Sequence, residues 1–170
     1  MKIKIIFLSI ILLLLSSGVY SQKQDASAAV QEFYKFHFAN ENIFNEKEVG
    51  LRREFFTPKL QQLFDAELKR QKIYLKKYPD NKPYFEGLSF EPIEFCKNDY
   101  SVGKTEGGGN RATVKVNFIY GKSSCDASDG TKIFYKISLL QIGGKWLIDN
   151  VIYDDGNMLV EAFNEAKNIK

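Results

Sequence analysis

Side chains that carry most catalytic and metal-binding chemistry are scarce in this chain of 170 residues. It contains one histidine, His37, and two cysteines, Cys96 and Cys125. Zinc sites and cysteine–histidine nucleophilic pairs need several such residues at defined spacings, and no such spacing occurs here. We therefore expect no metal site and no cofactor. No catalytic set can be assigned from the sequence, so whether the protein is an enzyme stays open, with a non-enzymatic role favoured.

Long apolar runs are also lacking, apart from Ile5 to Leu15 near the N-terminus. That run is shorter than the roughly 20 residues that a membrane-spanning helix needs. Lys2 and Lys4 precede it, and Val19-Tyr20-Ser21 follows it, which is the pattern of a secretory signal peptide. The sequence predicts a signal peptide over residues 1–21, a polar leader over 22–25 and one domain over 26–170. Cleavage near Ser21 would leave a periplasmic or secreted protein, with membrane contact only through the cleaved signal peptide.

A strong charge of one sign is missing too. The chain has 24 lysine and arginine residues against 21 acidic residues, a formal charge of +3. Loss of Lys2 and Lys4 with the signal peptide lowers this to +1. A nucleic-acid-binding domain normally carries a clear basic footprint. We therefore expect no nucleic-acid partner.

The two cysteines, Cys96 and Cys125, are the only candidates for a disulfide. An exported chain can keep such a bond. The pattern places Cys96 on a strand and Cys125 in a loop, and it does not fix their separation. A structural disulfide between them, two separate thiols and a free reactive thiol are the three interpretations.

The first half of the chain predicts helices. Apolar residues recur at three- and four-residue steps from Ala26 to Ala39, after Asp25 as N-cap. A short helix is expected after Asn45, paired with Glu48 as in a capping box, with Val49, Leu51, Phe55 and Phe56 facing inward. Thr57-Pro58 predicts the start of a helix that continues to about Lys76. The cations at its end, Lys69 to Lys77, are typical of a solvated helix end, and a nucleic-acid or lipid patch is the alternative.

From Pro92 onward the pattern predicts antiparallel strands. The expected strands are Ile93 to Val102, Arg111 to Tyr120, Lys132 to Ile142 and Lys145 to Tyr153, and a closing helix covers about Asn157 to Asn168. Gly103 to Asn110 is expected to be a flexible hairpin loop. Gly143-Gly144 is expected to be a tight turn. On the last strand, alternation places Trp146, Ile148, Asn150 and Ile152 on one face and Asp149 on the other.

The chain resembles an exported bacterial family, domain of unknown function 3828, and the wider nuclear-transport-factor-2-like superfamily. The resemblance spans about Ala26 to Ala166. It rests on Phe33-Tyr34, Phe56-Thr57-Pro58-x-Leu60, Tyr84-Phe85-x-Gly87-x-x-Phe90 and Gly144-Lys145-Trp146-Leu147-Ile148-Asp149-x-Val151. It implies an α+β cone in which N-terminal helices pack on a curved antiparallel sheet of about four strands, often with a pocket between them. It implies no single activity, because this fold carries many functions.

Three functions are compatible with these features. The first is a non-enzymatic binding module for an unknown small molecule or protein, with an aromatic pocket. The second is an envelope inhibitor or immunity-type protein that acts through a loop such as Gly103 to Asn110. The third is a small-molecule hydrolase or isomerase that uses Asp149 with His37 or a tyrosine. His37 is otherwise interpreted as a packed or rim residue. An interior filled by side chains would weigh against both ligand hypotheses. The expected pocket residues are Tyr34, His37, Tyr84, Phe85, Tyr120 and Trp146.

Overall fold

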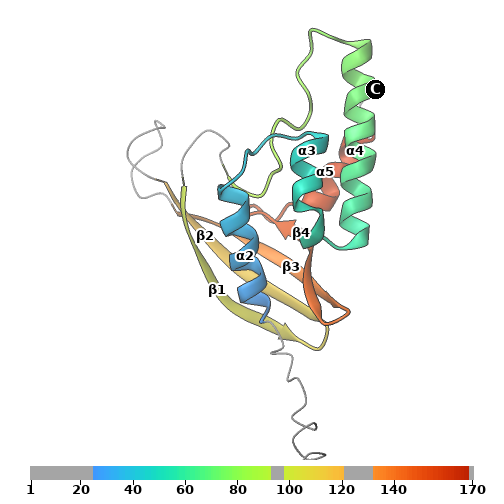
Figure 1. Cartoon of the computed structure of the whole chain (residues 1–170). Helices are drawn as coiled ribbons and strands as arrows, with labels where there is room; N and C mark the ends of the chain where they lie inside the picture. Colours follow the sequence, from blue (N-terminus) through green and yellow to red (C-terminus); the bar gives the residue numbers. More distant parts are fainter. Residues whose placement is uncertain (1–24, 93–97, 121–131, 169–170) are drawn as a thin grey trace, which may run out of the picture.

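The computed structural model describes residues 25–92, 98–120 and 132–168 (Figure 1). The signal peptide expected over 1–21, most of the leader, Cys96 and Cys125 lie outside these residues, and so does the question of a disulfide. The described elements are α2 (Ala26–Phe38), α3 (Glu46–Arg52), the 3₁₀ turn η1 (Arg53–Phe55), α4 (Pro58–Lys77), β1 (Asn98–Gly108), β2 (Arg111–Tyr120), β3 (Lys132–Ile142), β4 (Lys145–Ile152) and α5 (Leu159–Ala166). The expected α+β class is confirmed.

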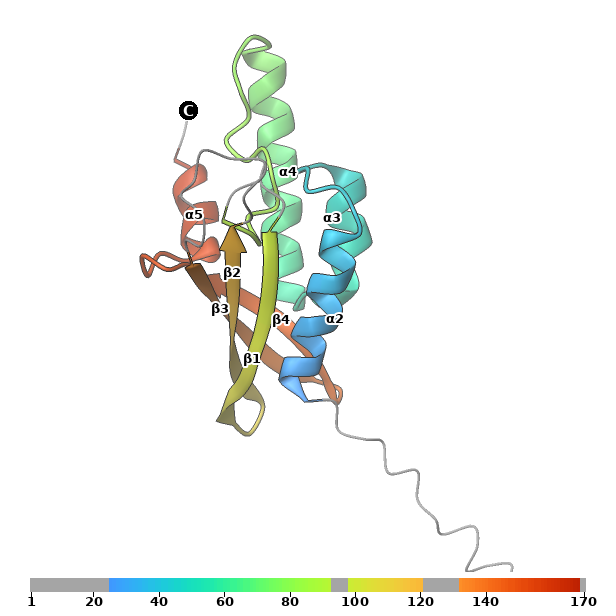
Figure 2. The ribbon, with the colours of Figure 1, turned by 90° about the vertical axis from the view of Figure 1, so that its left-hand side faces the viewer.

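The four strands form one curved antiparallel sheet in the order β1-β2-β3-β4. Helix α2 lies across one face of this sheet, and α3, α4 and α5 gather beyond β4 (Figures 1 and 2). The edge of β4 that does not pair with β3 contacts the chain just before α4, where Phe56 forms a parallel bridge with Ile148. We call the face that carries α2 the inner face and the opposite one the outer face.

Strands β2 and β3 have the bounds that alternation predicts, and β4 ends one residue earlier than expected. The prediction of a loop over Gly103 to Asn110 is wrong. Strand β1 continues to Gly108, and the hairpin turns at Gly109-Asn110. Glycine permits extended backbone as readily as a loop, and Gly103 lies at a bulge where an added Cβ would be 3.0 Å from the Lys115 carbonyl oxygen.

The helix starts follow the capping signals closely. Asn45 accepts the backbone N–H of Glu48 at 2.8 Å, and Thr57 accepts that of Leu60 at 3.2 Å. Asp25 occupies the N-cap position of α2, but its carboxylate accepts the hydroxyls of neighbouring side chains instead of a helix N–H. The inward orientation expected of Leu51 is wrong, since it is 43% exposed. The buried residues of α3 are Val49, as expected, and two charged residues, Glu48 and Arg52.

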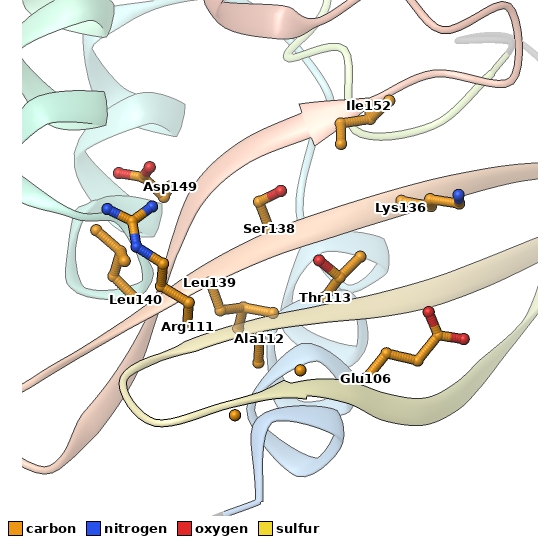
Figure 3. A pocket seen from close by; sticks show the side chains of 12 residues that line it. Glu106, Arg111, Ala112, Thr113, Lys136, Ser138, Leu139, Leu140, Asp149 and Ile152 are labelled. Atoms are coloured by element: carbon orange, nitrogen blue, oxygen red, sulfur yellow. The ribbon is translucent and has the colours of Figure 1, made fainter.

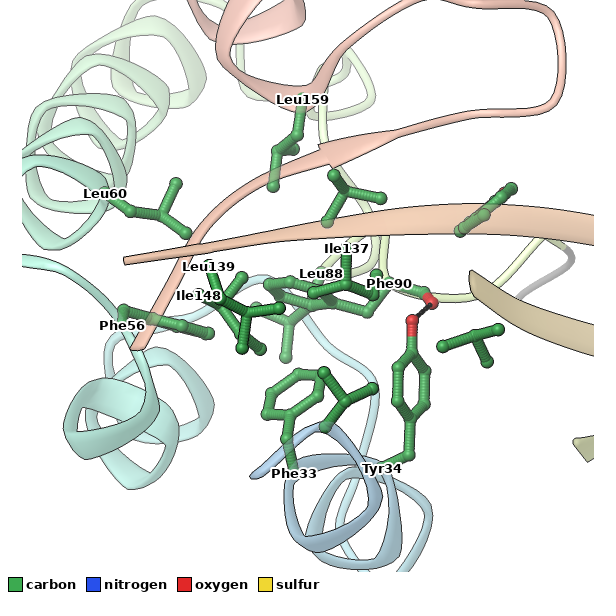
Figure 4. Packing of buried hydrophobic residues seen from close by; sticks show 14 of the residues in the cluster. Phe33, Tyr34, Phe56, Leu60, Leu88, Phe90, Ile137, Leu139, Ile148 and Leu159 are labelled. Carbon is green, nitrogen blue, oxygen red and sulfur yellow. Dashed lines mark hydrogen bonds between the residues drawn. The ribbon is translucent and has the colours of Figure 1, made fainter. Parts of the chain in front are cut away.

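The space between α2 and the inner face of the sheet is filled by side chains, many of them aromatic (Figure 4). The ring centroids of Phe33 and Phe90 are 4.8 Å apart, and those of Phe56 and Phe90 are 5.4 Å apart. Phe85, Leu88 and Phe90 bring the irregular segment before β1 into this core. Residues with no exposed surface include Phe33, Tyr34, Leu60, Phe64, Phe90, Val114, Val116, Phe118, Ile137 and Val151.

A β-bulge changes the faces of β4. Ile148 pairs with Leu139, and Asn150 pairs with Ser138, so Asp149 is the extra residue. Beyond the bulge the alternation is shifted by one, and Val151 is buried on the inner face in register with Ile137. The expectation that Asn150 and Ile152 share a face with Trp146 is therefore wrong. A bulge cannot be read from a pattern of period two.

Candidate functional site

The residues expected to line an aromatic pocket lie in different environments. Tyr34 and His37 are buried in α2, and Phe85 and Trp146 are each 8% exposed. Tyr84 is 46% exposed, and the side chain of Tyr120 lies outside the described part of the structure. Tyr34 and His37 are ring neighbours, as are Tyr84 and Phe85. The structure does not show these side chains converging on a common cavity.

Tyr34 and His37 are instead tied into the packed core. The Tyr34 hydroxyl donates to the Phe90 carbonyl at 2.8 Å, and burial raises the pKa of this phenol well above its ordinary value. His37 Nδ1 accepts the Arg52 Nε–H at 3.1 Å, while its Nε2 lies 3.7 Å from Glu91 Oε1. Burial lowers the pKa of His37 although the Glu91 carboxylate opposes this. The contact geometry makes His37 Nδ1 an acceptor for Arg52, and burial favours the neutral form of the ring.

Arg52 is fully buried and is the centre of a polar network between α2, α3 and their connection. Its Nη1 donates at 2.9 Å both to the Glu48 carbonyl and to Glu48 Oε2. Its Nη2 donates to the carbonyls of His37 and Glu41 at 3.3 and 3.0 Å. Hydrogen bonds from Arg52 and Lys47 hold the pKa of the Glu48 carboxyl below its ordinary value. These contacts give His37 and Arg52 a structural role.

A hollow of about 470 Å³ lies on the outer face of the sheet, opposite the face that carries α2 (Figure 3). Glu106 on β1, Thr113 on β2 and Ser138 on β3 are cross-strand neighbours in one row. Arg111 extends from β2 across β3 towards Asp149 on β4. The full lining consists of Glu106, Gly107, Gly108, Arg111, Ala112, Thr113, Lys136, Ser138, Leu139, Leu140, Asp149 and Ile152.

The bulge in β4 gives the hollow Asp149, one of its two acidic residues, the other being Glu106 on β1. As the extra residue, Asp149 accepts a hydrogen bond from the Thr57 hydroxyl at 2.9 Å. That same hydroxyl oxygen accepts the Leu60 N–H of α4, and the Thr57 N–H donates to the Ile148 carbonyl at 2.9 Å. The next residue, Asn150, contacts α5 instead, where its side-chain oxygen accepts the Val160 N–H. The bulge therefore places Asp149 at the hollow, and Thr57, the N-cap residue of α4, holds its side chain there.

The hollow combines cationic, hydroxyl and carboxylate groups in one open concavity. Arg111 is exposed, and no carboxylate among the described residues forms an ion pair with it. A guanidinium without such a partner in the described part of the chain is suited to bidentate recognition of a carboxylate or phosphate. The hydroxyls of Thr113 and Ser138 can donate or accept. This arrangement can bind a small polar anion.

The structure bears on two of the functions considered from the sequence, the enzyme with Asp149 and His37 and the inhibitor that acts through Gly103 to Asn110. Asp149 lines the outer hollow, whereas His37 lies in the core under the inner face, so the structure does not bring this pair to one site. Gly103 to Asn110 forms the end of the β1–β2 hairpin, and its residues Glu106 to Gly108 border the hollow.

The outer-face residues were only partly visible in the sequence. Alternation in β2 assigns Thr113 and Lys115 to the solvated face, and Ser138 interrupts an apolar run. These signals mark a polar face but not a concavity. The hollow depends on sheet curvature and on the bulge at Asp149, which the sequence pattern does not reveal.

The Thr57 link gives a direct test of how Asp149 is held. Thr57→Val removes both the N-cap acceptor and the donor to Asp149, and we expect it to lower the free energy of unfolding by about 1–2 kcal/mol. Thr57→Ser keeps the hydroxyl and should cost less than half as much. Urea unfolding followed by circular dichroism measures both. A loss in Thr57→Ser as large as that in Thr57→Val would contradict this, because it would show that the methyl group contributes as much as the hydroxyl.

No protein-family model and no curated protein matches the chain. The function is therefore inferred from the geometry of the site. Within the described residues, no group of three or more histidine, cysteine, aspartate or glutamate side chains is arranged to hold a metal ion. None of the helices in residues 25–92, 98–120 and 132–168 is both long and apolar enough to span a bilayer.

Proposed function

We propose that this chain is an exported, non-enzymatic binding module of nuclear-transport-factor-2-like architecture, which binds a small organic anion in the outer-face hollow. One observation carries the proposal: Arg111, two hydroxyl side chains and Asp149 come from three strands and converge on one open concavity. The volume of about 470 Å³ falls within the range of about 300–1,000 Å³ that is usual for small-molecule sites.

The architecture supports the superfamily part of the proposal at the level of layers. A curved antiparallel sheet with helices on its inner face, ending in a hairpin at Gly143-Gly144 and a short helix, is what the resemblance implies. The location of the site differs from the pocket between helices and sheet that the resemblance suggests. That inner space is occupied here by Phe33, Tyr34 and Phe90.

The chemistry of the hollow defines the ligand class. The Arg111 guanidinium would bind a carboxylate or phosphate through two parallel hydrogen bonds. Asp149 Oδ1 already accepts from Thr57, and its carboxylate can accept a further hydroxyl or amine hydrogen from the ligand. Leu140 and Ile152 add apolar lining. A compact acid or phosphate ester with a donor group a few bonds away fits this set.

A calorimetric panel tests the proposal, with citrate, malate, inorganic phosphate and glycerol 3-phosphate as probes. We expect at least one probe to bind, and Arg111→Met to weaken it by 10-fold or more, since charged hydrogen bonds contribute roughly 1.5–3 kcal/mol. Lys104→Met removes an exposed cation of the same sheet that does not line the hollow, and should leave affinity within about twofold. Equal loss in both variants, or no binding by any probe, would contradict the proposal.

A further inference from the structure

The C-terminal half of α4 has a composition unlike the rest of the protein. From Ala66 to Tyr78 it contains five cations, and its one acid, Glu67, is buried and bonded to Arg70 at 2.6 Å. The local charge of +4 exceeds the +3 of the whole chain. Positive charge is therefore concentrated on this half-helix, while the rest of the chain is close to balanced.

These cations surround an exposed apolar side chain. Ile73 is 61% exposed, the most exposed of the large hydrophobic residues in the described structure. Lys69 and Lys76 lie four residues before it and three after it, so all three share one helix face. That face is turned away from the core, because Phe64, Glu67 and Gln71 form the buried face of α4.

The position of this half-helix leaves it accessible. Helix α4 extends past the ends of α3 and α5 in both views (Figures 1 and 2). Tyr74 lies in the last turn of α4 and Tyr78 is its C-cap residue, and their ring centroids are 5.3 Å apart. Lys77 Nζ lies 4.9 Å from the centre of the Tyr78 ring. Lysines around an exposed aliphatic residue, with tyrosines at the border, are typical of helices that lie on a membrane surface.

Lys72, one residue before Ile73, lies off this face and pairs with Glu46 of α3 at 3.6 Å. We propose that the surface of α4 formed by Lys69, Ile73, Lys76 and Lys77 binds an anionic lipid membrane. The lysines would contact lipid phosphates while Ile73 enters the headgroup region. Charge complementarity favours this occupant over a neutral surface. The exposed Ile73 at the centre favours lipid over nucleic acid, whose phosphate backbone offers an aliphatic side chain no partner.

Vesicle flotation with the full chain tests the proposal. We expect binding to vesicles of phosphatidylglycerol and phosphatidylcholine to exceed binding to pure phosphatidylcholine vesicles, and to weaken as salt rises from 0.05 to 0.5 M (about 14 to 4 Å screening length). The triple variant K69Q/K76Q/K77Q should reduce partitioning into anionic vesicles by about 100-fold or more, at about 1 kcal/mol per lysine. Ile73→Ser should reduce it further at unchanged charge.

The matched control K104Q/K115Q/K132Q removes the same charge from the sheet and should keep vesicle binding within about threefold of the parent. The apolar N-terminal residues are identical in all variants, and neutral vesicles measure their contribution. Equal loss in the two triple variants would overturn the proposal, because the effect would then follow net charge alone. It would also be overturned if anionic and neutral vesicles bound equally, or if the chain bound an oligonucleotide but no vesicle.

Discussion

Replacing Arg52 with leucine is expected to lower the free energy of unfolding by about 3–5 kcal/mol, because it leaves the buried Glu48 carboxylate with only the exposed Lys47 as a charged partner. Arg52 has no exposed surface and donates to Glu48, His37 and Glu41. The leucine variant would remove these donors from the Glu48 carboxylate, from His37 Nδ1 and from three backbone carbonyls. Urea unfolding at pH 7 gives the free energy directly.

The neighbouring arginine is a close control for this experiment. Arg53 pairs with Asp65, but both side chains are about half exposed, at 44% and 50%. Exposed ion pairs contribute about 0–1 kcal/mol, so Arg53→Leu should change stability by less than about 1 kcal/mol. In the double variant R52L/E48Q the buried carboxylate that lost Arg52 is removed as well, and part of the loss should be recovered. If Arg52→Leu cost no more than Arg53→Leu, the buried network would not hold α2 and α3 together.

Replacing Phe90 with alanine should cost about 3–5 kcal/mol, the usual range when a buried aromatic ring leaves a cavity. Phe90 has no exposed surface, and its ring contacts those of Phe33, Phe56 and Phe64. It also places the carbonyl that accepts the Tyr34 hydroxyl. The experiment tests whether the segment before β1 is part of the core or a cover over an interior pocket.

Tyr84 provides the comparison within the same segment. Its ring contacts Phe85 and lies 5.9 Å from the Arg70 guanidinium, but it is 46% exposed. Tyr84→Ala should therefore cost less than about 1 kcal/mol, as most exposed substitutions do. Thermal or urea unfolding of both variants would separate the two roles. Similar small losses at Phe90 and Tyr84 would indicate that the segment is a loose cover.

The parts of the fold that follow local rules could be predicted from sequence. Strand β2 has the bounds that its alternation predicts, because Ala112, Val114, Val116 and Phe118 all face the core. Helix α4 begins at Pro58, because a hydroxyl N-cap and a proline at the first turn are both local signals.

The parts of the fold and of the site that depend on tertiary contacts could not be predicted from the sequence. The glycines of 103–109 permit strand or loop equally, and pairing with β2 decides between them. Arg52 takes a core position that an apolar pattern assigns elsewhere, because its donors meet acceptors of His37, Glu41 and Glu48. Asp149 lines the hollow because of a bulge, and Thr57, distant in the chain, holds it there. The candidate site was therefore expected on the inner face.

The most direct test of the proposed function maps where a small anion binds. Backbone amide shifts of ¹⁵N-labelled protein would be followed during titration with the tightest of citrate, malate, phosphate and glycerol 3-phosphate. Binding in the outer-face hollow predicts saturable shifts at Arg111, Thr113, Ser138 and Asp149, with little change along α2. Shifts centred on Tyr34 and His37, with none on the outer face, would contradict it.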